Sequence, residues 1–125
     1  MLSNDYFSRW MDINNFKIGL GTCEFKCTVK KEMLNGFGIL HGGITYSLSD
    51  SALAFASNSY GFQCVSVETS ISHLKTVKEN DVLHVITSEI SRGKTLGIYS
   101  ISIFNQDKQL VSKFKGTVHI SVKSW

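Results

Sequence analysis

The chain contains no proline, only three cysteines among 125 residues, and few charges. Without proline, a common marker of strand and helix ends is missing. The cysteines form no C-x-x-C pair and are odd in number, which argues against a zinc site and against a disulfide framework. Cys23 and Cys27 lie four positions apart on a predicted strand, about 13 Å, which is too far for a disulfide bond. We therefore expect reduced cysteines in the core.

The sequence also lacks long apolar runs and a strong charge of either sign. No run reaches the length of a membrane span, and the N-terminal residues contain no uninterrupted apolar segment of a secretory signal, so we expect a cytoplasmic protein without membrane contact. The net charge of +3 is too small and too scattered to indicate nucleic-acid binding, although it suits an anionic small ligand. With 42% hydrophobic and 18% charged residues, the composition predicts one globular domain over residues 1–125.

The hydrophobic pattern predicts one long helix and several strands. Residues 3–12 are typical of a short amphipathic helix that packs on the domain through Phe7, Trp10 and Met11. Apolar and polar residues alternate strictly over residues 22–29, which indicates a half-buried strand. From about residue 40 to 59 the apolar residues recur at helical spacing with almost no charge, as expected for a helix enclosed on most sides.

The remainder of the chain predicts four strands separated by polar turns. They are expected at about 65–74, 82–92, 96–105 and 110–122. In chain order this is a strand, a long apolar helix and a four-strand antiparallel meander, with a sheet that can curl around the helix.

A single carboxylate, Asp50, lies in the middle of the apolar helix. An ionised carboxylate in apolar surroundings costs several kcal/mol unless it is paired or its pKa shifts. Asp50 is therefore a candidate catalytic acid or base. The alternative, equally weighted from the local residues, is that it caps another group or shares a polar stripe with Ser47, Ser51 and Asn58.

His41, Gly42 and Gly43 lie where the long helix begins. Free N–H groups and the helix dipole at such a terminus attract negative charge or a developing oxyanion, and glycine lets a ligand approach the backbone. A tight turn, with His41 as a helix cap, is the structural alternative. Gly42 and Asp50 are eight positions apart, about 12 Å along a helix. Both can act on one carbonyl only if they come from different subunits, which predicts a two-fold dimer with interfacial sites.

The run "NGFGILHGGITYSLSDSALAFASNSYG", with "VSVETSISHL", "ENDVL" and "SRGKTLGIYSISIFNQDKQLV", closely resembles hotdog-fold acyl-CoA thioesterases of the PaaI type. The resemblance covers essentially everything after the N-terminal helix. It implies an α+β hotdog fold, in which a curved antiparallel sheet wraps a long central helix. It also implies homodimers that commonly pair into homotetramers.

This resemblance implies roles for five residues. Asp50 matches the catalytic carboxylate and Gly42 the oxyanion-hole amide, while Asn35, His41 and Ser66 match the upstream Asn, the motif histidine and the polar residue that holds the attacking water. No metal or redox cofactor is implied, and coenzyme A is part of the substrate. Asp50 would activate water as a general base or attack as a nucleophile.

Coenzyme A is anionic, so we expect surface cations to contact its phosphates. Arg92 and Lys94 in the "SRGKT" turn and Lys75 are the candidates, the alternative being an ordinary solvated turn. The family usually has proline and glycine where this chain has Thr76 and Asn80; these departures affect a turn in which Asn tolerates the left-handed conformation. The other histidines, at positions 73, 84 and 119, have no ligand spacing and are expected to be structural.

The sequence thus predicts an acyl-CoA thioesterase for small acyl groups, with aromatic acids of the phenylacetyl or hydroxyphenylacetyl type as one option. Two alternatives remain. One is a hotdog hydratase or dehydratase, against which the order of HGG and Asp argues. The other is a non-catalytic acyl-CoA-binding module on the same fold, which the presence of Asp50 disfavours.

Overall fold

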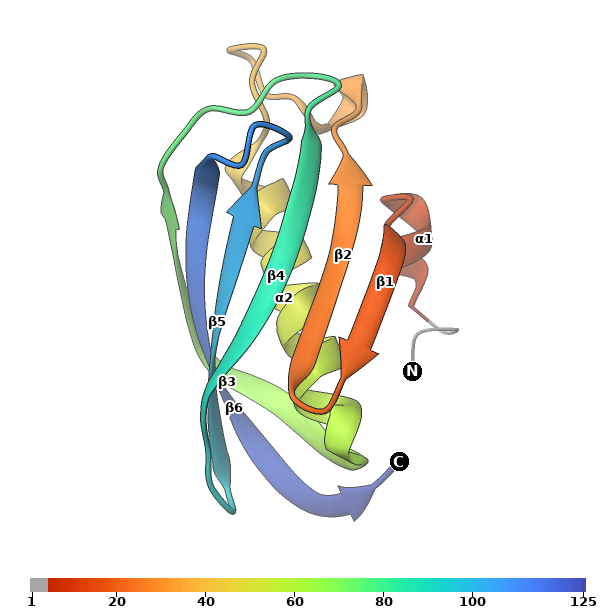
Figure 1. The fold of residues 1–125 in the computed structure, drawn as a ribbon, viewed down its shortest axis with the longest axis vertical. Helices are drawn as coiled ribbons and strands as arrows, with labels where there is room; N and C mark the ends of the chain where they lie inside the picture. Colours follow the sequence, from red (N-terminus) through yellow and green to blue (C-terminus); the bar gives the residue numbers. More distant parts are fainter. Residues whose placement is uncertain (1–4) are drawn as a thin grey trace.

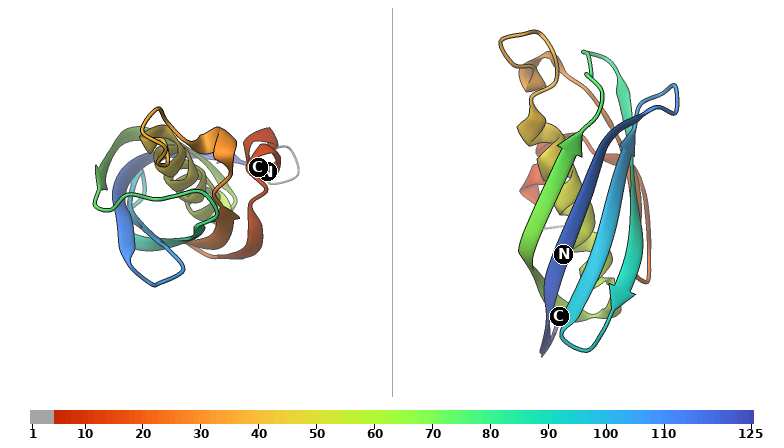
Figure 2. Two further views of the ribbon diagram at one scale, coloured as in Figure 1. Left: turned by 90° about the horizontal axis from the view of Figure 1, so that it is seen from above. Right: turned by 90° about the vertical axis from the view of Figure 1, so that its left-hand side faces the viewer.

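The computed structural model describes residues 5–125 and has an α+β architecture, in which a six-stranded antiparallel sheet curls around one long helix (Figures 1 and 2). Seen from above, the helix lies inside the curve of the sheet (Figure 2, left). The elements are, in chain order, α1 (Tyr6–Trp10), β1 (Asn14–Gly19), β2 (Thr22–Thr28), α2 (Gly42–Ser57), β3 (Phe62–His73), β4 (Val82–Arg92), β5 (Leu96–Phe104) and β6 (Leu110–Ser124). The long helix and the five strands expected from the sequence are confirmed.

The predicted four-strand meander is confirmed for β4, β5 and β6 but is wrong for β3. The strand order is β1-β2-β4-β5-β6-β3, so β3 pairs with β6 at one end of the sheet and β4 pairs with β2. After β3, the chain crosses over the N-terminal end of α2 to reach β4 (Figure 1). This crossing lets the sheet cover the helix from both flanks, which a hairpin between β3 and β4 would not do. Asn80, in the crossing, has a φ of 72°, which confirms the left-handed conformation expected there.

Strand β1 was not predicted, because its residues do not alternate between apolar and polar. Its side chains are exposed except for Phe16, which is partly buried and packs on Phe25 and Phe55 with ring centroids 5.4 and 5.7 Å apart. Asn15 has a φ of 56°, and the pairing with β2 shifts register between Asn14 and Lys17. An edge strand with a bulge leaves too little periodicity to be recognised.

The N-terminal helix ends at Trp10, two residues before the predicted end at residue 12, and residues 3 and 4 of the predicted range lie outside the described part of the chain. Met11 is buried as expected, at 1% exposure, and Phe7 packs against the core. Trp10, expected to face the domain, is instead 66% exposed. The helix ends at Trp10 after little more than one turn, so the spacing of three and four residues does not extend far enough to form a common buried face.

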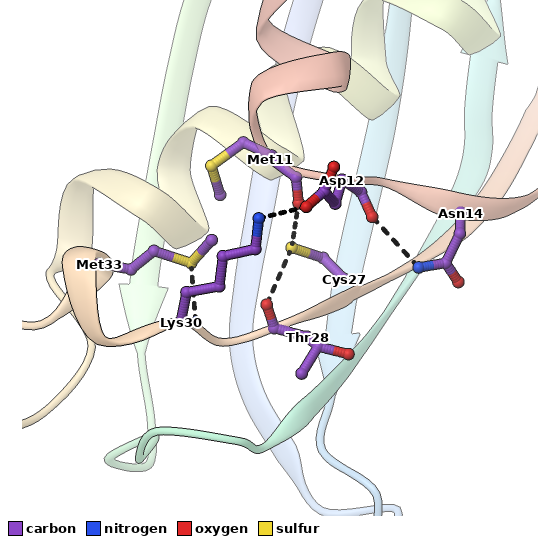
Figure 3. A network of polar contacts seen from close by, with 7 residues as sticks. All are labelled: Met11, Asp12, Asn14, Cys27, Thr28, Lys30 and Met33. Carbon is purple, nitrogen blue, oxygen red and sulfur yellow. Dashed lines mark hydrogen bonds and ion pairs between the residues drawn. The ribbon is translucent and has the colours of Figure 1, made fainter.

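Polar contacts connect this N-terminal segment to the end of β2 (Figure 3). The ammonium of Lys30 pairs with the carboxylate of Asp12, and the thiol of Cys27 donates to the carbonyl oxygen of Met11 across 3.4 Å. All three cysteines are free, and burial raises the pKa of the Cys23 thiol to about 12 and that of Cys27 to about 11. These two cysteines are thus protonated core residues, as expected.

The helix lies close to the sheet because β6 has a glycine opposite it. A Cβ placed on Gly116 would lie 2.6 Å from a methyl carbon of Leu53, which is buried on α2. Only a residue without a side chain allows this approach. Among residues 5–125, no helix is both long and apolar enough to cross a membrane.

Candidate active site

The N-terminus of α2 presents backbone N–H groups to a hollow at the surface. His41 is the N-cap, and its Nδ1 accepts a hydrogen bond from the N–H of Gly43 at 2.9 Å. The histidine thus takes the helix-cap role considered from the sequence. Gly42 is the first helical residue, and an N–H at this position has no partner within its own helix. It is therefore available to a ligand, together with the positive end of the helix dipole.

Asn35 lies in the loop before the helix and lines the same hollow. Its Oδ1 accepts hydrogen bonds from the N–H groups of Phe37 at 2.9 Å and Ile39 at 3.4 Å. Because the oxygen is occupied by these two donors, the Nδ2 hydrogens remain for another group. Asn35, Gly42 and Lys75 line one hollow of about 360 Å³, so the structure brings these three predicted residues together.

His73, the last residue of β3, also lines this hollow. It was expected to be structural because it has neither motif spacing nor a sequence neighbour of known role. Its ring lies directly against Gly42, since a Cβ placed there would be 3.2 Å from Nε2 of His73. The antiparallel pairing of β3 with β6, which the sequence did not predict, places His73 at this end of the sheet.

Asp50 faces a different hollow of about 250 Å³, with Ser66 of β3 on its wall. The carboxylate is half-buried, and burial raises its pKa above the ordinary value. No hydrogen bond or ion pair with another residue of the range 5–125 compensates for this burial. The alternative that Asp50 caps another group is therefore not realised, and the structure shows an acid with its proton affinity raised beside an open space.

The two hollows share no lining residue. The chain brings Asp50 together with Ser66, and Gly42 together with Asn35, but the helix keeps the two pairs about 12 Å apart. Each hollow holds one part of the chemistry that acyl transfer requires, donors for an oxyanion or a base for water. One chain therefore carries two incomplete halves of such a site.

Arg92 is placed differently from the expected surface cation. Its guanidinium donates hydrogen bonds to the carbonyl oxygen of Ser57 at 3.0 Å and to the hydroxyl of Tyr99 at 2.8 Å, and it stacks over Tyr60 at 4.0 Å. The cause is a β-bulge between Glu89 and Ser91, which reverses the alternation of β4 and turns Arg92 to the inner face.

Lys94 is exposed in the turn after β4, two residues beyond Arg92, whose guanidinium contacts Ser57 at the C-terminal end of α2. Lys75 is exposed at the opposite end of the helix, in the Gly42 hollow. Residues 5–125 hold no group of three or more His, Cys, Asp or Glu side chains close enough together to bind a metal ion.

Comparison with known proteins identifies the family of the chain. The model of the thioesterase superfamily matches residues 37–112, and the chain belongs to this superfamily of thioester hydrolases with the hotdog fold. Within it, the chain is of the PaaI type. It is 34% identical over 119 residues to acyl-coenzyme A thioesterase PaaI of Escherichia coli, a match covering 95% of this chain and 85% of that protein.

Solved structures agree with the sequence match. The E. coli PaaI protein from the phenylacetic acid degradation operon superimposes with a TM-score of 0.96 at 32% identity, over 99% of this chain and 90% of that one. A Streptococcus mutans protein bound to acetyl CoA superimposes with a TM-score of 0.84 at 30% identity, over 90% and 93%. Human acyl-coenzyme A thioesterase 13 is 31% identical over 101 residues, 78% of this chain and 71% of the relative. These similarities support the fold class that the sequence predicted.

Proposed function

We propose that the protein hydrolyses small acyl-CoA thioesters at sites shared between two copies of the chain. The observation that carries this proposal is Asp50, a half-buried carboxylate with a raised pKa and no partner among the described residues, in a hollow separate from the Gly42 donors. A carboxylate whose pKa is raised is a stronger base than an exposed aspartate, which suits it to accept a proton from water. The names of the PaaI and human relatives support the acyl-CoA substrate.

Strand β3 supports the pairing of two copies. It forms one end of the sheet, its twelve residues pair only with β6, and its outward Val65 and Val67 are 64% and 60% exposed. A long unpaired edge of this kind is a template for another strand. Ser66 lies near one end of β3 and His73 at the other, so antiparallel pairing of two β3 edges sets the Asp50 hollow of one copy beside the Gly42 hollow of its partner. Two such dimers would form the expected homotetramer.

In the completed site, the thioester carbonyl oxygen accepts hydrogen bonds from the Gly42 N–H and the Asn35 amide. Asp50 of the partner subunit, with Ser66 orienting the water, takes a proton from water as the hydroxide attacks the carbonyl carbon. The tetrahedral intermediate then collapses, the carbon–sulfur bond breaks, and the coenzyme A thiolate leaves and is protonated by solvent. In the nucleophilic version the carboxylate attacks first, and water hydrolyses the resulting anhydride. His41 keeps the helix N-terminus in place through its cap.

The anionic end of coenzyme A would contact exposed cations. Lys75 lies in the Gly42 hollow, and Lys94 follows Arg92, which contacts Ser57 on the wall of the Asp50 hollow. Arg92 has intrachain partners, so we assign the phosphate contact to the two lysines first. Tyr46 lies on α2 between Gly42 and Asp50 and remains 37% exposed. Its ring favours an aromatic acyl group such as phenylacetyl.

A panel of acyl-CoAs tests the proposal. Phenylacetyl-CoA and hydroxyphenylacetyl-CoA are compared with short and medium aliphatic acyl-CoAs, and Asp50→Asn is assayed in parallel as a nearly isosteric control. Release of thiol is measured against the background of the three free cysteines. Hydrolysis that collapses in Asp50→Asn supports the thioesterase, and the rank order of kcat/KM gives the acyl preference. Binding of the CoA esters without turnover would instead support the non-catalytic module.

A further inference from the structure

His73 and Thr45 form a pair beside the predicted oxyanion donor. Nδ1 of His73 lies 3.3 Å from the hydroxyl oxygen of Thr45, which in turn lies 3.0 Å from the carbonyl oxygen of Gly42. Thr45 is 4% exposed, so its hydroxyl has little access to water. The three groups form a short chain of hydrogen bonds that begins at the backbone of Gly42.

The direction of these bonds fixes the tautomer of the neutral histidine. A hydroxyl carries one proton, and the Gly42 carbonyl can only accept, so the contact of 3.0 Å requires that Thr45 donates its proton there. Thr45 must then accept from His73, which places the ring proton on Nδ1. In a neutral imidazole the other nitrogen carries a lone pair, so Nε2 of His73 is a hydrogen-bond acceptor.

This acceptor lies at the mouth of the proposed site. Nε2 is the atom of His73 nearest to the position that a Cβ on Gly42 would occupy, and within residues 5–125 it has no hydrogen-bond partner. It shares its hollow with Asn35 and Lys75, which are donors. A lone pair cannot stabilise an oxyanion, so its partner must be an N–H or O–H group of the ligand, close to the carbonyl that Gly42 polarises.

Coenzyme A carries such a group close to its sulfur. In its cysteamine unit, two methylene carbons separate the sulfur from an amide N–H, so this N–H lies a few bonds away from the thioester carbonyl. We propose that His73, held by Thr45, is a specificity-determining residue that accepts a hydrogen bond from this amide N–H and selects pantetheine-type thioesters. The inference rests on the proposed thioesterase function and adds to it a residue that recognises the leaving group.

The test compares two small substrates of one acyl group. The first is the thioester of N-acetylcysteamine, which retains the amide N–H, and the second is its analogue in which CH₂ replaces that NH. His73→Phe is assayed on both esters, with His84→Phe as the matched control because His84 lines neither hollow. Wild-type protein should prefer the amide ester in kcat/KM by about 3- to 10-fold, the value of one neutral hydrogen bond. His73→Phe should lose that preference, and His84→Phe should retain it.

Other outcomes contradict the inference in distinguishable ways. If His73→Phe lowers kcat/KM equally for both esters, or leaves the preference intact, the inference about His73 is wrong. If His73→Phe does not fold, as judged by circular dichroism, Thr45→Val replaces it, since loss of the hydroxyl frees the ring tautomer and should reduce the same preference. If wild-type protein hydrolyses neither ester nor any acyl-CoA, the proposed function itself fails.

Discussion

The two hollows along α2 differ in chemistry although one helix supplies both. At the N-terminus of the helix, Gly42 and Asn35 offer hydrogen-bond donors that are in place because of a glycine, a cap and a turn. Two turns further on, Asp50 offers a base whose proton affinity is set by burial among apolar walls. The donors need an exposed helix end, whereas the base needs partial burial, so a straight helix cannot provide both at one point. The difference explains why a complete site would require a second copy.

Of the substitutions that test the two hollows, Asp50→Asn should cause the largest loss of activity. The amide keeps the shape of the side chain but cannot accept a proton from water, so we expect kcat to fall by about 10²- to 10⁴-fold. Substrate affinity, measured by isothermal titration calorimetry with a slowly hydrolysed acyl-CoA, should change little. A fall in affinity with kcat retained would show that Asp50 contacts the substrate without acting as a base or nucleophile.

Asn35→Asp, which removes a hydrogen-bond donor from the Gly42 hollow, should lower kcat by a smaller factor. The carboxylate can still accept from the N–H groups of Phe37 and Ile39, so the loop is kept, but the Nδ2 donor is lost and a negative charge faces the oxyanion. Loss of one oxyanion donor lowers kcat by about 10²- to 10³-fold. Steady-state kinetics on the preferred acyl-CoA measures this, and Asn35→Ala, which loses both functions, should in addition lower thermal stability. Unchanged kcat in Asn35→Asp would remove Asn35 from the site.

Mixing the two inactive variants tests whether the halves come from different chains. Asp50→Asn and Asn35→Asp are unfolded together at equal amounts and refolded, so that half of the dimers are mixed. In a mixed dimer one site carries both substitutions and the other carries neither, which should restore roughly a quarter of wild-type activity. Each variant refolded alone is the control. A mixture as inactive as its components would show that both halves act within one chain.

The pH dependence should reflect the burial of Asp50. Its pKa is raised above 3.8 by desolvation, so the active carboxylate is lost on acidification at a higher pH than for an exposed aspartate. The acid limb of the kcat/KM profile should therefore have its midpoint above 3.8. An acid limb at or below the ordinary aspartate value would contradict the assignment of Asp50 as the base.

The smallest expected effect concerns stability. Because the pKa of Asp50 is higher in the folded chain than in the unfolded chain, the folded state loses stability as pH rises through this range. Asp50→Asn removes that loss and should raise Tm at neutral pH by about 1–3 °C, a modest gain because water still reaches the carboxylate. Calorimetry should show the gain disappearing as the pH falls below the ordinary value of 3.8, where the carboxyl is protonated in both states. Ser51→Ala is a control from the same helix.

The residues of the candidate site that the sequence itself suggests are those with a local signal. Asp50 is unusual within an apolar helix, the two glycines mark the start of that helix, and the distance between them follows from the helical rise alone. Asn35 and Ser66 came only from the family resemblance, because an Asn in a loop and a Ser on a strand have no distinctive surroundings in the sequence.

What the sequence did not predict depends on contacts between distant segments. His73 reaches Gly42 because β3 pairs with β6 and not with β4, and strand partners cannot be read from alternation alone. Strand β1 has no alternation to read, because its edge position leaves both faces exposed. The exposure of Trp10 was not predicted either, because its helical spacing from Phe7 gives no sign that the helix ends at Trp10.

The β-bulge near the end of β4 has a consequence at the level of the gene. The bulge is produced by one extra residue at Ile90, which is 62% exposed and has no partner opposite it on β5. Deletion of that single codon would let Ser91 follow Glu89 directly, so Arg92 would keep its place opposite Gly97 and its inward direction. The clamp from Arg92 to the end of α2 would therefore survive the deletion. One in-frame deletion at this position thus removes the bulge without releasing the arginine.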